Sequence, residues 1–361
     1  MNIIIDKNKI FGPVSKIVSI TEKRSLMPIL SNILFEFGKE GTTIFSTDLE
    51  VSAIAFIDCK VEKERKIVVH GRKFLEVLRE LEGGEIQLLL EENKLTIKQK
   101  RTEIVMSLQD PEEFPETKEI KGKEEFMIDG KTLLSMIEKV GFAVSTDETR
   151  YILTGMYMQG IEGELIMVGT DGFRMALCRR KVKELKSFKG VTIPKRSVIE
   201  AERIIEEEDE VKISIEEKYV QFSTEKLKII TRIIEGNFPD YENVLPSNNP
   251  KILKIDKESF HRGLKRASAI IGRSEPVKIT FSERNMEIDA ESDIGRAKED
   301  IEVDYDGEKT SMSFNARFIL DVVAHIAGEK LIMMAPETYG AVLFRGEQEE
   351  DYKNIVMPIR I

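Results

Sequence analysis

The sequence holds only two cysteines among 361 residues, Cys59 and Cys178, and it has no tryptophan. Two cysteines so far apart cannot form the disulfide framework of a small secreted domain, so we expect both to fill cores in a reducing compartment. No segment approaches the ~18 consecutive apolar residues of a membrane span. The N-terminus meets a charge at Asp6 after three isoleucines, which leaves no signal-peptide core. A soluble, cytoplasmic protein is therefore expected.

The usual signatures of catalysis are also scarce. The only histidines, His70, His261 and His325, have no partner at metal-ligand spacing, and no Gly-rich phosphate loop is present. A Ser-x-x-Lys pattern at 223–226 lies in a strand-like alternation without its companion motifs. We therefore expect no catalytic residue, no metal and no cofactor.

The composition is that of an ordinary globular protein, 41% hydrophobic and 33% charged, and its length suggests two or three domains. Acidic residues outnumber basic ones by 65 to 55, giving a net charge of −10. This balance argues against a protein that coats nucleic acid with its whole surface, although a local basic surface stays open.

Three stretches of the chain repeat one pattern, a short apolar strand that ends at an aspartate. The aspartates are Asp6, Asp129 and Asp256, at offsets of 123 and 127 residues. Apolar side chains then recur every three or four residues, which predicts an amphipathic helix with the aspartate as its N-cap. A second strand-to-helix unit follows in each repeat, with helices predicted over 72–81, 195–205 and 316–326. Alternating segments after these helices predict strands over 85–90, 210–215 and 330–334.

The repeat predicts an α+β fold of three similar domains, each with two helices packed on antiparallel sheet. Phe-Pro pairs at 114–115 and 238–239 lie in stretches that cannot continue a central strand. We therefore place the domains at 1–120, 121–248 and 249–361.

Positive charge gathers on the first helix of each repeat, over 8–24, 130–142 and 257–268, whereas the second helices are neutral. Three equivalent basic faces suit contact with phosphates that reads no base sequence, and duplex backbone is the favoured ligand because no stacking platform for single strands is visible. The basic side chains singled out are Lys9, Lys16, Lys23, Arg262, Lys265 and Arg266.

Other readings of these features stay open. The lysine faces could be no more than the solvated sides of amphipathic helices, as in a monomeric repeat adaptor that binds only proteins. They could also hold a small acidic substrate of an enzyme. The segment 170–174 could be an acidic catalytic turn, but a tight turn with glycine at positive φ is preferred.

A set of motifs in a fixed order makes the sequence resemble the bacterial DNA polymerase sliding clamps, the β subunits of the replicative holoenzyme. The resemblance covers the whole chain, and the sequence differs from the family's usual pattern at Phe173 and Asn243. The motifs are Leu26-Met27-Pro28-Ile29-Leu30-Ser31-Asn32, Thr47-Asp48-Leu49-Glu50, Arg150-Tyr151, Gly169-Thr170-Asp171-Gly172-Phe173-Arg174, Asn237-Phe238-Pro239-Asp240-Tyr241, Val244-Leu245-Pro246 and Val356-Met357-Pro358-Ile359-Arg360-Ile361.

The resemblance implies a head-to-tail homodimer whose six domains form a ring around duplex DNA, with helices lining the hole. It implies a seam of Ile104 and Met106 against Ile270 and Ile271 of the other subunit. Further DNA contacts carried over from the family are Arg24, Arg72, Tyr151, Lys195 and Arg196.

The resemblance also implies a processivity factor that is loaded on DNA by a clamp loader. It would tether the replicative polymerase, other polymerases and repair proteins. These partners would insert a short linear motif into a hydrophobic cleft between the second and third domains. The cleft residues carried over are Leu153, Thr170, Gly172, Phe173, Arg174, Met175, Pro239, Val244, Ile355, Met357, Pro358 and Ile359.

Overall fold

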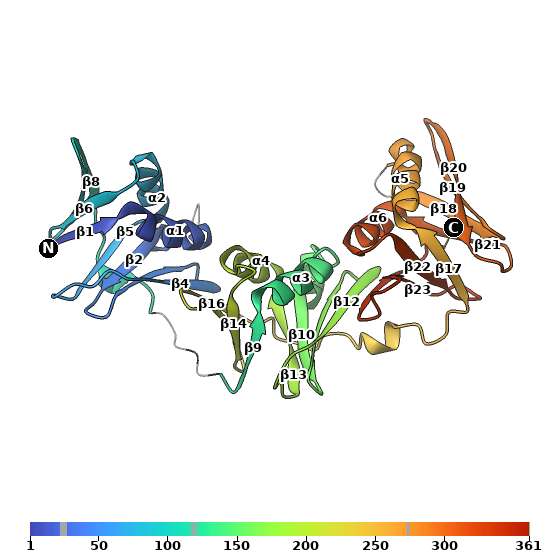
Figure 1. Ribbon diagram of the computed structural model, residues 1–361, viewed down its shortest axis with the longest axis horizontal. Coiled ribbons are helices and arrows are strands. Elements are labelled where there is room, and N and C mark those ends of the chain that lie inside the picture. Colours follow the sequence, from blue (N-terminus) through green and yellow to red (C-terminus); the bar gives the residue numbers. More distant parts are fainter. Residues whose placement is uncertain (22–26, 117–119, 121, 273–274, 361) are drawn as a thin grey trace. The chain divides into compact units, whose positions relative to one another are not determined.

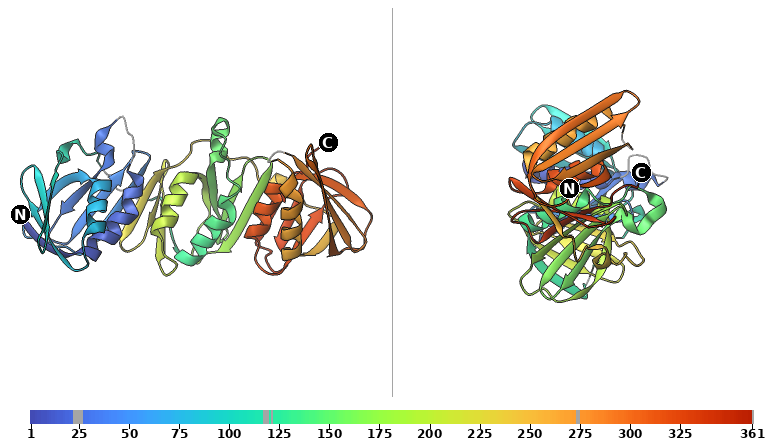
Figure 2. Two further views of the ribbon diagram at one scale, coloured as in Figure 1. Left: turned by 90° about the horizontal axis from the view of Figure 1, so that it is seen from above. Right: turned by 90° about the vertical axis from the view of Figure 1, so that its right-hand side faces the viewer.

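The computed structural model describes residues 1–21, 27–116, 120, 122–272 and 275–360. The chain divides into two compact units (Figure 1 and Figure 2). Unit 1 contains residues 1–134 and 196–233, and unit 2 contains 135–195 and 234–361. The domain boundaries predicted near residues 120 and 248 stay a prediction.

Unit 1 contains an eight-stranded and a four-stranded antiparallel sheet. The strand order is β5-β2-β3-β4-β16-β15-β14-β9 in the larger sheet and β1-β6-β7-β8 in the smaller. Its strands are β1 (Asn2–Asp6), β2 (Asn32–Phe37), β3 (Thr42–Thr47), β4 (Val51–Ile57), β5 (Arg65–His70), β6 (Glu85–Leu90), β7 (Lys94–Gln99), β8 (Thr102–Ser107), β9 (Glu124–Asp129), β14 (Glu210–Ile215), β15 (Tyr219–Ser223) and β16 (Leu227–Arg232). Its helices are α1 (Lys7–Ile17), η1 (Val18–Ile20), η2 (Pro28–Ser31), α2 (Gly71–Glu80), η3 (Pro111–Glu113) and all but the first residue of α4 (Lys195–Ile204).

Unit 2 is built on one twelve-stranded sheet in the order β13-β10-β11-β12-β24-β23-β22-β17-β20-β19-β18-β21. Its strands are β10 (Gly155–Ile161), β11 (Glu164–Thr170), β12 (Arg174–Lys181), β13 (Phe188–Pro194), β17 (Lys251–Asp256), β18 (Pro276–Ser282), β19 (Asn285–Ser292), β20 (Gly295–Asp304), β21 (Thr310–Asn315), β22 (Lys330–Ala335), β23 (Val342–Gly346) and β24 (Tyr352–Val356). Its helices are the later part of α3 (Gly130–Gly141), η4 (Glu148–Thr154), η5 (Glu242–Val244), α5 (Lys257–Ala267), η6 (Ser268–Ile270) and α6 (Ala316–His325).

The predicted helices and their caps are confirmed. Asp6 accepts a hydrogen bond from the Asn8 amide, and the two other capping aspartates accept from Thr132 and Ser259 at 2.8 and 3.0 Å. The second helices α2, α4 and α6 each lie within one residue of the predicted bounds. The α+β fold with antiparallel sheets is therefore as expected.

The strands fall in the same order in the three repeats, β1–β8, β9–β16 and β17–β24. This makes β4, β12 and β20 equivalent to one another, and likewise β8, β16 and β24. In unit 1, β4 pairs with β16, and in unit 2, β12 pairs with β24. Each unit thus holds one junction at which strands of successive repeats join into a continuous sheet.

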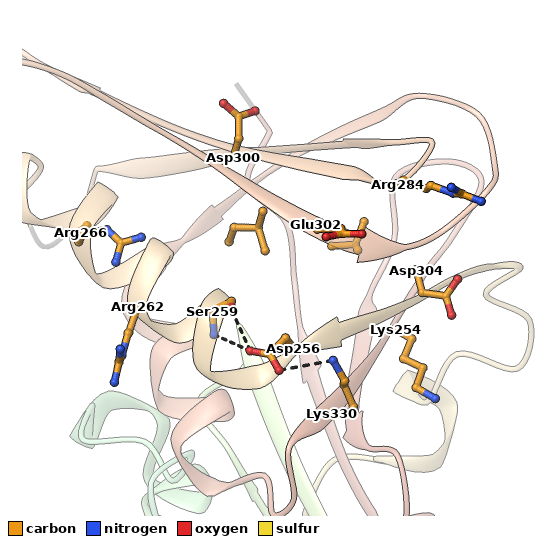
Figure 3. Close-up of a pocket in the computed structure, with 12 residues that line it drawn as sticks. Lys254, Asp256, Ser259, Arg262, Arg266, Arg284, Asp300, Glu302, Asp304 and Lys330 are labelled. Carbon is orange, nitrogen blue, oxygen red and sulfur yellow. Dashed lines mark hydrogen bonds and ion pairs between the residues drawn. The ribbon is translucent and has the colours of Figure 1, made fainter.

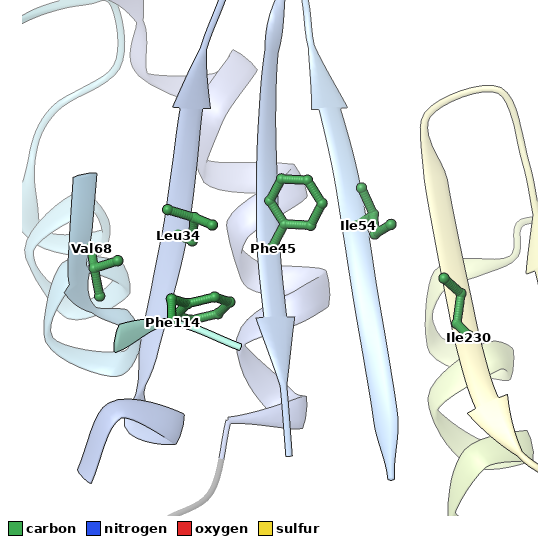
Figure 4. Packing of buried hydrophobic residues seen from close by; sticks show 6 residues of the cluster. All are labelled: Leu34, Phe45, Ile54, Val68, Phe114 and Ile230. Atoms are coloured by element: carbon green, nitrogen blue, oxygen red, sulfur yellow. The ribbon is translucent and has the colours of Figure 1, made fainter. Parts of the chain in front are cut away.

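A buried apolar cluster seals the junction in unit 1 (Figure 4). Burying these side chains on one face of a continuous sheet removes apolar area from water at about 25 cal/mol per Å². The cluster contains Leu34, Phe45, Ile54, Val68, Phe114 and Ile230. Hence Phe114, which the sequence placed in an inter-repeat stretch, contributes to the core.

Among the described helices, none is both long and apolar enough to cross a membrane.

Candidate functional site

Two of the basic side chains on the first helices are free of charged partners in the part of the chain that the structure describes. Lys9 on α1 and Lys265 on α5 are both exposed, and no ion pair joins either to an acid. Such side chains can release counterions from a phosphate backbone without first breaking an internal pair. Lys23 and Arg24 lie outside the described residues.

Lys16 is held by a neighbouring repeat within unit 1. Its ammonium lies 2.6 Å from Glu206 Oε1 and donates to the carbonyl of Ile204, the last residue of α4. Its side chain is 28% exposed. Lys16 therefore joins α1 to the C-terminal end of α4, and a phosphate would have to compete with Glu206 for it.

The basic side chains of α5 are paired with acids of unit 2. Arg262 lies 2.5 Å from Glu258 on the same helix, and Arg266 makes two hydrogen bonds to Glu299 on β20. Both line a cavity beside the helix (Figure 3). The two arginines are more than 60% exposed, so solvent screens these pairs strongly.

Arg72 and Arg196 stand at equivalent positions near the start of α2 and α4, but their partners differ. Arg72 Nη2 donates to the carbonyl of Thr21 at 3.0 Å. Arg196 Nη2 lies 2.6 Å from Asp48 Oδ2, an ion pair that lacks the alignment of a hydrogen bond. The Asp48 carboxylate is only 1% exposed, so Arg196 compensates a charge enclosed in the β3–β4 turn.

The remaining predicted DNA contacts, Tyr151 and Lys195, belong to unit 2. Tyr151 in η4 is 62% exposed. Lys195 is half-buried, and desolvation, followed by the charge of Arg174, lowers the pKa of its ammonium. The sequence alone carried no sign that Lys195 and Arg174 share an electrostatic environment.

The segment 170–174 is a tight turn, as preferred. Gly172 has φ +83°, and Asp171 Oδ1 accepts from the amides of Phe173 and Arg174. Thr170 Oγ1 donates to the carbonyl of Arg174 at 2.6 Å. The turn leaves Phe173 56% exposed at its tip.

Arg174 connects this turn to two helices of unit 2. Its guanidinium lies 3.1 Å from Asp171 and 2.6 Å from Asp321 on α6, and Nη2 donates to the carbonyl of Phe142. It also lies 4.6 Å from the ring centroid of Phe318. With a side chain only 11% exposed, Arg174 acts as a fixed support of the turn.

An apolar cluster lies behind the turn on the sheet of unit 2. It brings together two predicted cleft residues, Met175 and Ile355, with four that were not predicted as such. Tyr157 stacks on Phe238 at 4.6 Å beside this cluster. The added members are Ile166, Val168, Leu177 and Tyr241.

Tyr241 belongs to a motif quoted from the sequence but was not named as a site residue. It is 6% exposed, its hydroxyl donates to Gln159 Oε1, and burial raises the pKa of its phenol to about 12. Period-two alternation in β11 and β12 is the signal that could have found Val168 and Leu177, which are paired directly across these strands.

The C-terminal residues run beside the 170–174 turn. The Met357 amide donates to the carbonyl of Phe173 at 2.9 Å, and the Tyr339 hydroxyl donates to the carbonyl of Pro358. Leu153 and Pro358 are buried and Met357 is half-buried. Three other predicted cleft residues, Pro239, Val244 and Ile359, are exposed and lie outside the buried cluster.

The predicted seam residues lie at strand edges. Ile104 and Met106 are half-buried on β8, the last strand of the smaller sheet of unit 1. In unit 2, Ile270 and Ile271 are half-buried beside the β19–β20 hairpin, where the Ser292 hydroxyl donates to the carbonyl of Ile270.

The thiols behave as core groups. Cys59 is 7% exposed and Cys178 is fully buried, and burial raises the pKa of Cys178 to about 11. Within the ranges that the structure describes, no cluster of three or more His, Cys, Asp or Glu side chains could hold a metal ion.

Comparisons with known proteins agree across the whole chain. Family models of the DNA polymerase III beta subunit match residues 1–118 (N-terminal domain), 127–240 (central domain) and 242–360 (C-terminal domain). The Beta sliding clamp of Caulobacter vibrioides is 30% identical over 378 residues, covering 100% of both chains. The crystal structure of the DNA polymerase III subunit beta from Pseudomonas aeruginosa superposes with a TM-score of 0.97 at 26% identity. The sliding clamp of Caulobacter crescentus superposes at 0.94 with 29% identity, and both matches cover 100% of each chain.

Proposed function

The chain belongs to the family of DNA polymerase III β subunits, the bacterial sliding clamps, and from this premise we propose that it forms a homodimeric ring around duplex DNA. In that ring it acts as a processivity factor that catalyses no reaction and needs no cofactor. The observation that carries the proposal is the match of all three domain models along one chain with full-length coverage of its relatives.

The DNA contact in this proposal is electrostatic and independent of sequence. Exposed cations on first helices, Lys9 in unit 1 and Lys265 in unit 2, supply it, while the acidic remainder of the chain repels nucleic acid. Further contacts proposed at the same surface come from residues with internal partners or in the short helix η4. They are Lys16, Arg72, Tyr151, Lys195, Arg196, Arg262 and Arg266, and Lys23 and Arg24 belong to the same proposal.

Ring closure is supported by the two sheet junctions within the chain. Successive repeats join through β4 with β16 and through β12 with β24. The equivalent pair for a third junction, β20 and β8, cannot be completed by this arrangement, because β8 ends its sheet and residues 295–302 of β20 pair only with β19 in the described structure. A second copy supplies both missing partners head to tail, as closed rings require.

Partner proteins are proposed to insert an extended peptide beside the 170–174 turn. Exposed apolar side chains, Phe173, Val244 and Ile359, border the surface, and Met175 and Ile355 form part of its apolar base. An apolar surface with a few fixed polar groups suits a short hydrophobic motif. The proposed partners are the replicative polymerase, the clamp loader, and other polymerases and repair proteins.

Tethering then works through effective concentration. A polymerase attached to a ring that cannot leave its template rebinds the primer before it diffuses away. The protein acts in the cytoplasm, on the nucleoid.

The test is topological. A clamp loader with ATP should load the protein on a nicked circular plasmid, and the complex should survive gel filtration in high salt. Cutting the plasmid once should release the protein, because a ring slides off a free end. Retention on the linear product would contradict a ring, and a particle of 41.3 kDa with no DNA retention would favour the monomeric adaptor.

A further inference from the structure

We propose that β8 of one copy docks along β20 of a second copy in a single register, with Glu103 opposite Lys298 and Arg101 opposite Asp300. This inference rests on the homodimer proposed above and adds the pairing that selects its register. The occupant of the β20 edge is thus a second copy of this chain, and the pairing follows from the internal repeat.

The hairpins before each junction have equal length, which fixes the equivalent positions. Four residues separate the last hairpin pair in β3–β4, in β11–β12 and in β19–β20, where Glu291 pairs with Arg296. Ser52, Met175 and Arg296 are therefore equivalent. On the opposite side of the junction, Val105 is equivalent to Ile230 and Ile355. The list of hairpin pairs is Thr47 with Ser52, Thr170 with Met175, and Glu291 with Arg296.

The two junctions inside the chain use the same register. Ser52 lies opposite Ile230 in unit 1, and Met175 lies opposite Ile355 in unit 2. Equivalent backbone hydrogen bonds flank both junctions. They are Phe56 amide to Lys226 carbonyl and Arg179 amide to Asp351 carbonyl at one end, and Arg232 amide to Glu50 carbonyl and Met357 amide to Phe173 carbonyl at the other.

Transferring this register to the third junction places Arg296 opposite Val105 of the second copy. Two residues further along each strand, Lys298 then lies opposite Glu103 and Asp300 opposite Arg101. The Asp300 amide would donate to the carbonyl of Arg101, as its two equivalents do within the chain.

The charges on these strands match the transferred register. Lys98 lies opposite Glu103 on β7 and β8, and Lys298 lies opposite Asp289 on β20 and β19. Joining Glu103 to Lys298 completes one row of alternating sign across four strands, Lys98, Glu103, Lys298 and Asp289. Opposite charges that face each other across strands are stabilising, and like charges are not.

Slipped registers lose this match. A shift of two residues in one direction sets Glu103 against Asp300, and a shift in the other sets Arg101 against Lys298. A shift of one residue turns the apolar and charged faces of β8 over. The charge row thus favours one pairing over its neighbours.

The apolar side chains fit the same register. Val105 is 54% exposed, although its equivalents Ile230 and Ile355 are 5% and 1% exposed within buried clusters. Figure 4 shows how Ile230 reaches the cluster from β16. On the other face of β8, Ile104 would oppose the small Ala297, leaving room for the larger side chain.

A cavity beside β20 accommodates the end of the incoming hairpin (Figure 3). It measures about 880 Å³, and β20 lines it with Asp300, Glu302 and Asp304. The equivalent cavity in unit 1 lies beside α1 and β4, and the β15–β16 turn lines it with Glu225 and Lys226. The corresponding turn of the second copy is Lys100-Arg101, a basic pair that complements the acidic strand.

Charge reversal tests the register. Glu103→Lys and Lys298→Glu, each made alone, should each weaken the dimer at least about tenfold, since each dimer contains two copies of the contact. The double variant E103K/K298E should recover most of that loss, because the pair is restored with its signs exchanged. The control Lys66→Glu breaks a cross-strand pair with Glu36 on β2 and β5, away from the seam, and should leave the dimer unchanged.

Sedimentation equilibrium over a wide concentration range measures each dissociation constant. A wild-type chain that stays at 41.3 kDa throughout would overturn the homodimer itself. A wild-type dimer that neither single reversal weakens, or that the double variant fails to restore, would overturn the register and leave the dimer standing. Circular dichroism of each variant verifies that it is folded.

Discussion

Lys139 on α3 and Glu349 in the β23–β24 turn form an ion pair whose side chains are only 13% and 14% exposed. The ammonium lies 4.6 Å from the ring centroid of Tyr352, whose hydroxyl donates to the carbonyl of Lys139. Glu349 also accepts from the Ala327 amide, just after α6. The pair thus joins the second repeat to the third inside unit 2, as Lys16 with Glu206 joins the first to the second inside unit 1.

Replacing Lys139 should destabilise unit 2. In Lys139→Met the Glu349 carboxylate stays enclosed without its cation, which costs about 3 kcal/mol. The double variant K139M/E349Q should recover part of this, because the glutamine amide oxygen can still accept from Ala327. Urea denaturation measures the effect, and Lys131→Met, at an exposed position of the same helix, is the control. Equal midpoints for K139M and K131M would contradict a stabilising role.

The helix caps should contribute to acid sensitivity. Hydrogen bonds from the backbone amides of Thr132 and Ser259 hold the pKa values of Asp129 and Asp256 below their ordinary 3.8. A depressed pKa gives stability that is complete above the unfolded value and is lost as the pH falls through the folded value. Asparagine still caps but does not titrate.

Asp129→Asn and Asp256→Asn should therefore be less stable than the wild type at pH 7, and the difference should shrink toward zero near pH 3. Unfolding free energies from urea titrations at several pH values measure this. A difference that stays constant with pH would show that the caps contribute no proton linkage.

Gly172 should be required for the geometry of the peptide surface. At φ +83° a Cβ is strained, and it would lie 2.8 Å from the Arg150 guanidinium. Gly172→Ala should cost about 1 kcal/mol of stability and weaken binding of a hydrophobic motif peptide. Gly163→Ala is a matched control, because Gly163 has the same φ in the β10–β11 turn with open space around it. Fluorescence anisotropy of a labelled peptide compares them, and equal affinities would remove the turn from the site.

The lysines of α1 should differ in their effect on DNA. Lys9 is exposed without an acidic partner among the described residues, whereas Lys16 is paired with Glu206. Lys9→Gln should make the dependence of affinity on salt shallower by about one unit of slope per contact. Lys16→Gln should change that slope less. Affinity for a duplex oligonucleotide at 50–200 mM salt is the measurement, and equal slopes for both variants would mean that Lys16 leaves Glu206 to reach DNA.

Much of the fold could be predicted because it depends on local signals repeated three times. The capping aspartates, the helix periodicity and the alternating strands are each encoded within a dozen residues, and the structure confirms them. Contacts between distant segments could not be predicted. Nothing near Lys16 in the sequence identifies Glu206, and nothing near Arg174 identifies Asp321, because tertiary packing selects these partners.

The pairing of β4 with β16 also constrains how the chain can be synthesised. Val51 pairs with Thr231, so the edge of the first repeat stays open on the ribosome until the end of the second repeat has emerged. Open strand edges favour pairing with other chains, and contacts between distant segments form slowly. The continuity that makes the finished sheet stiff thus makes the nascent first repeat the part most exposed to aggregation, and most in need of a chaperone.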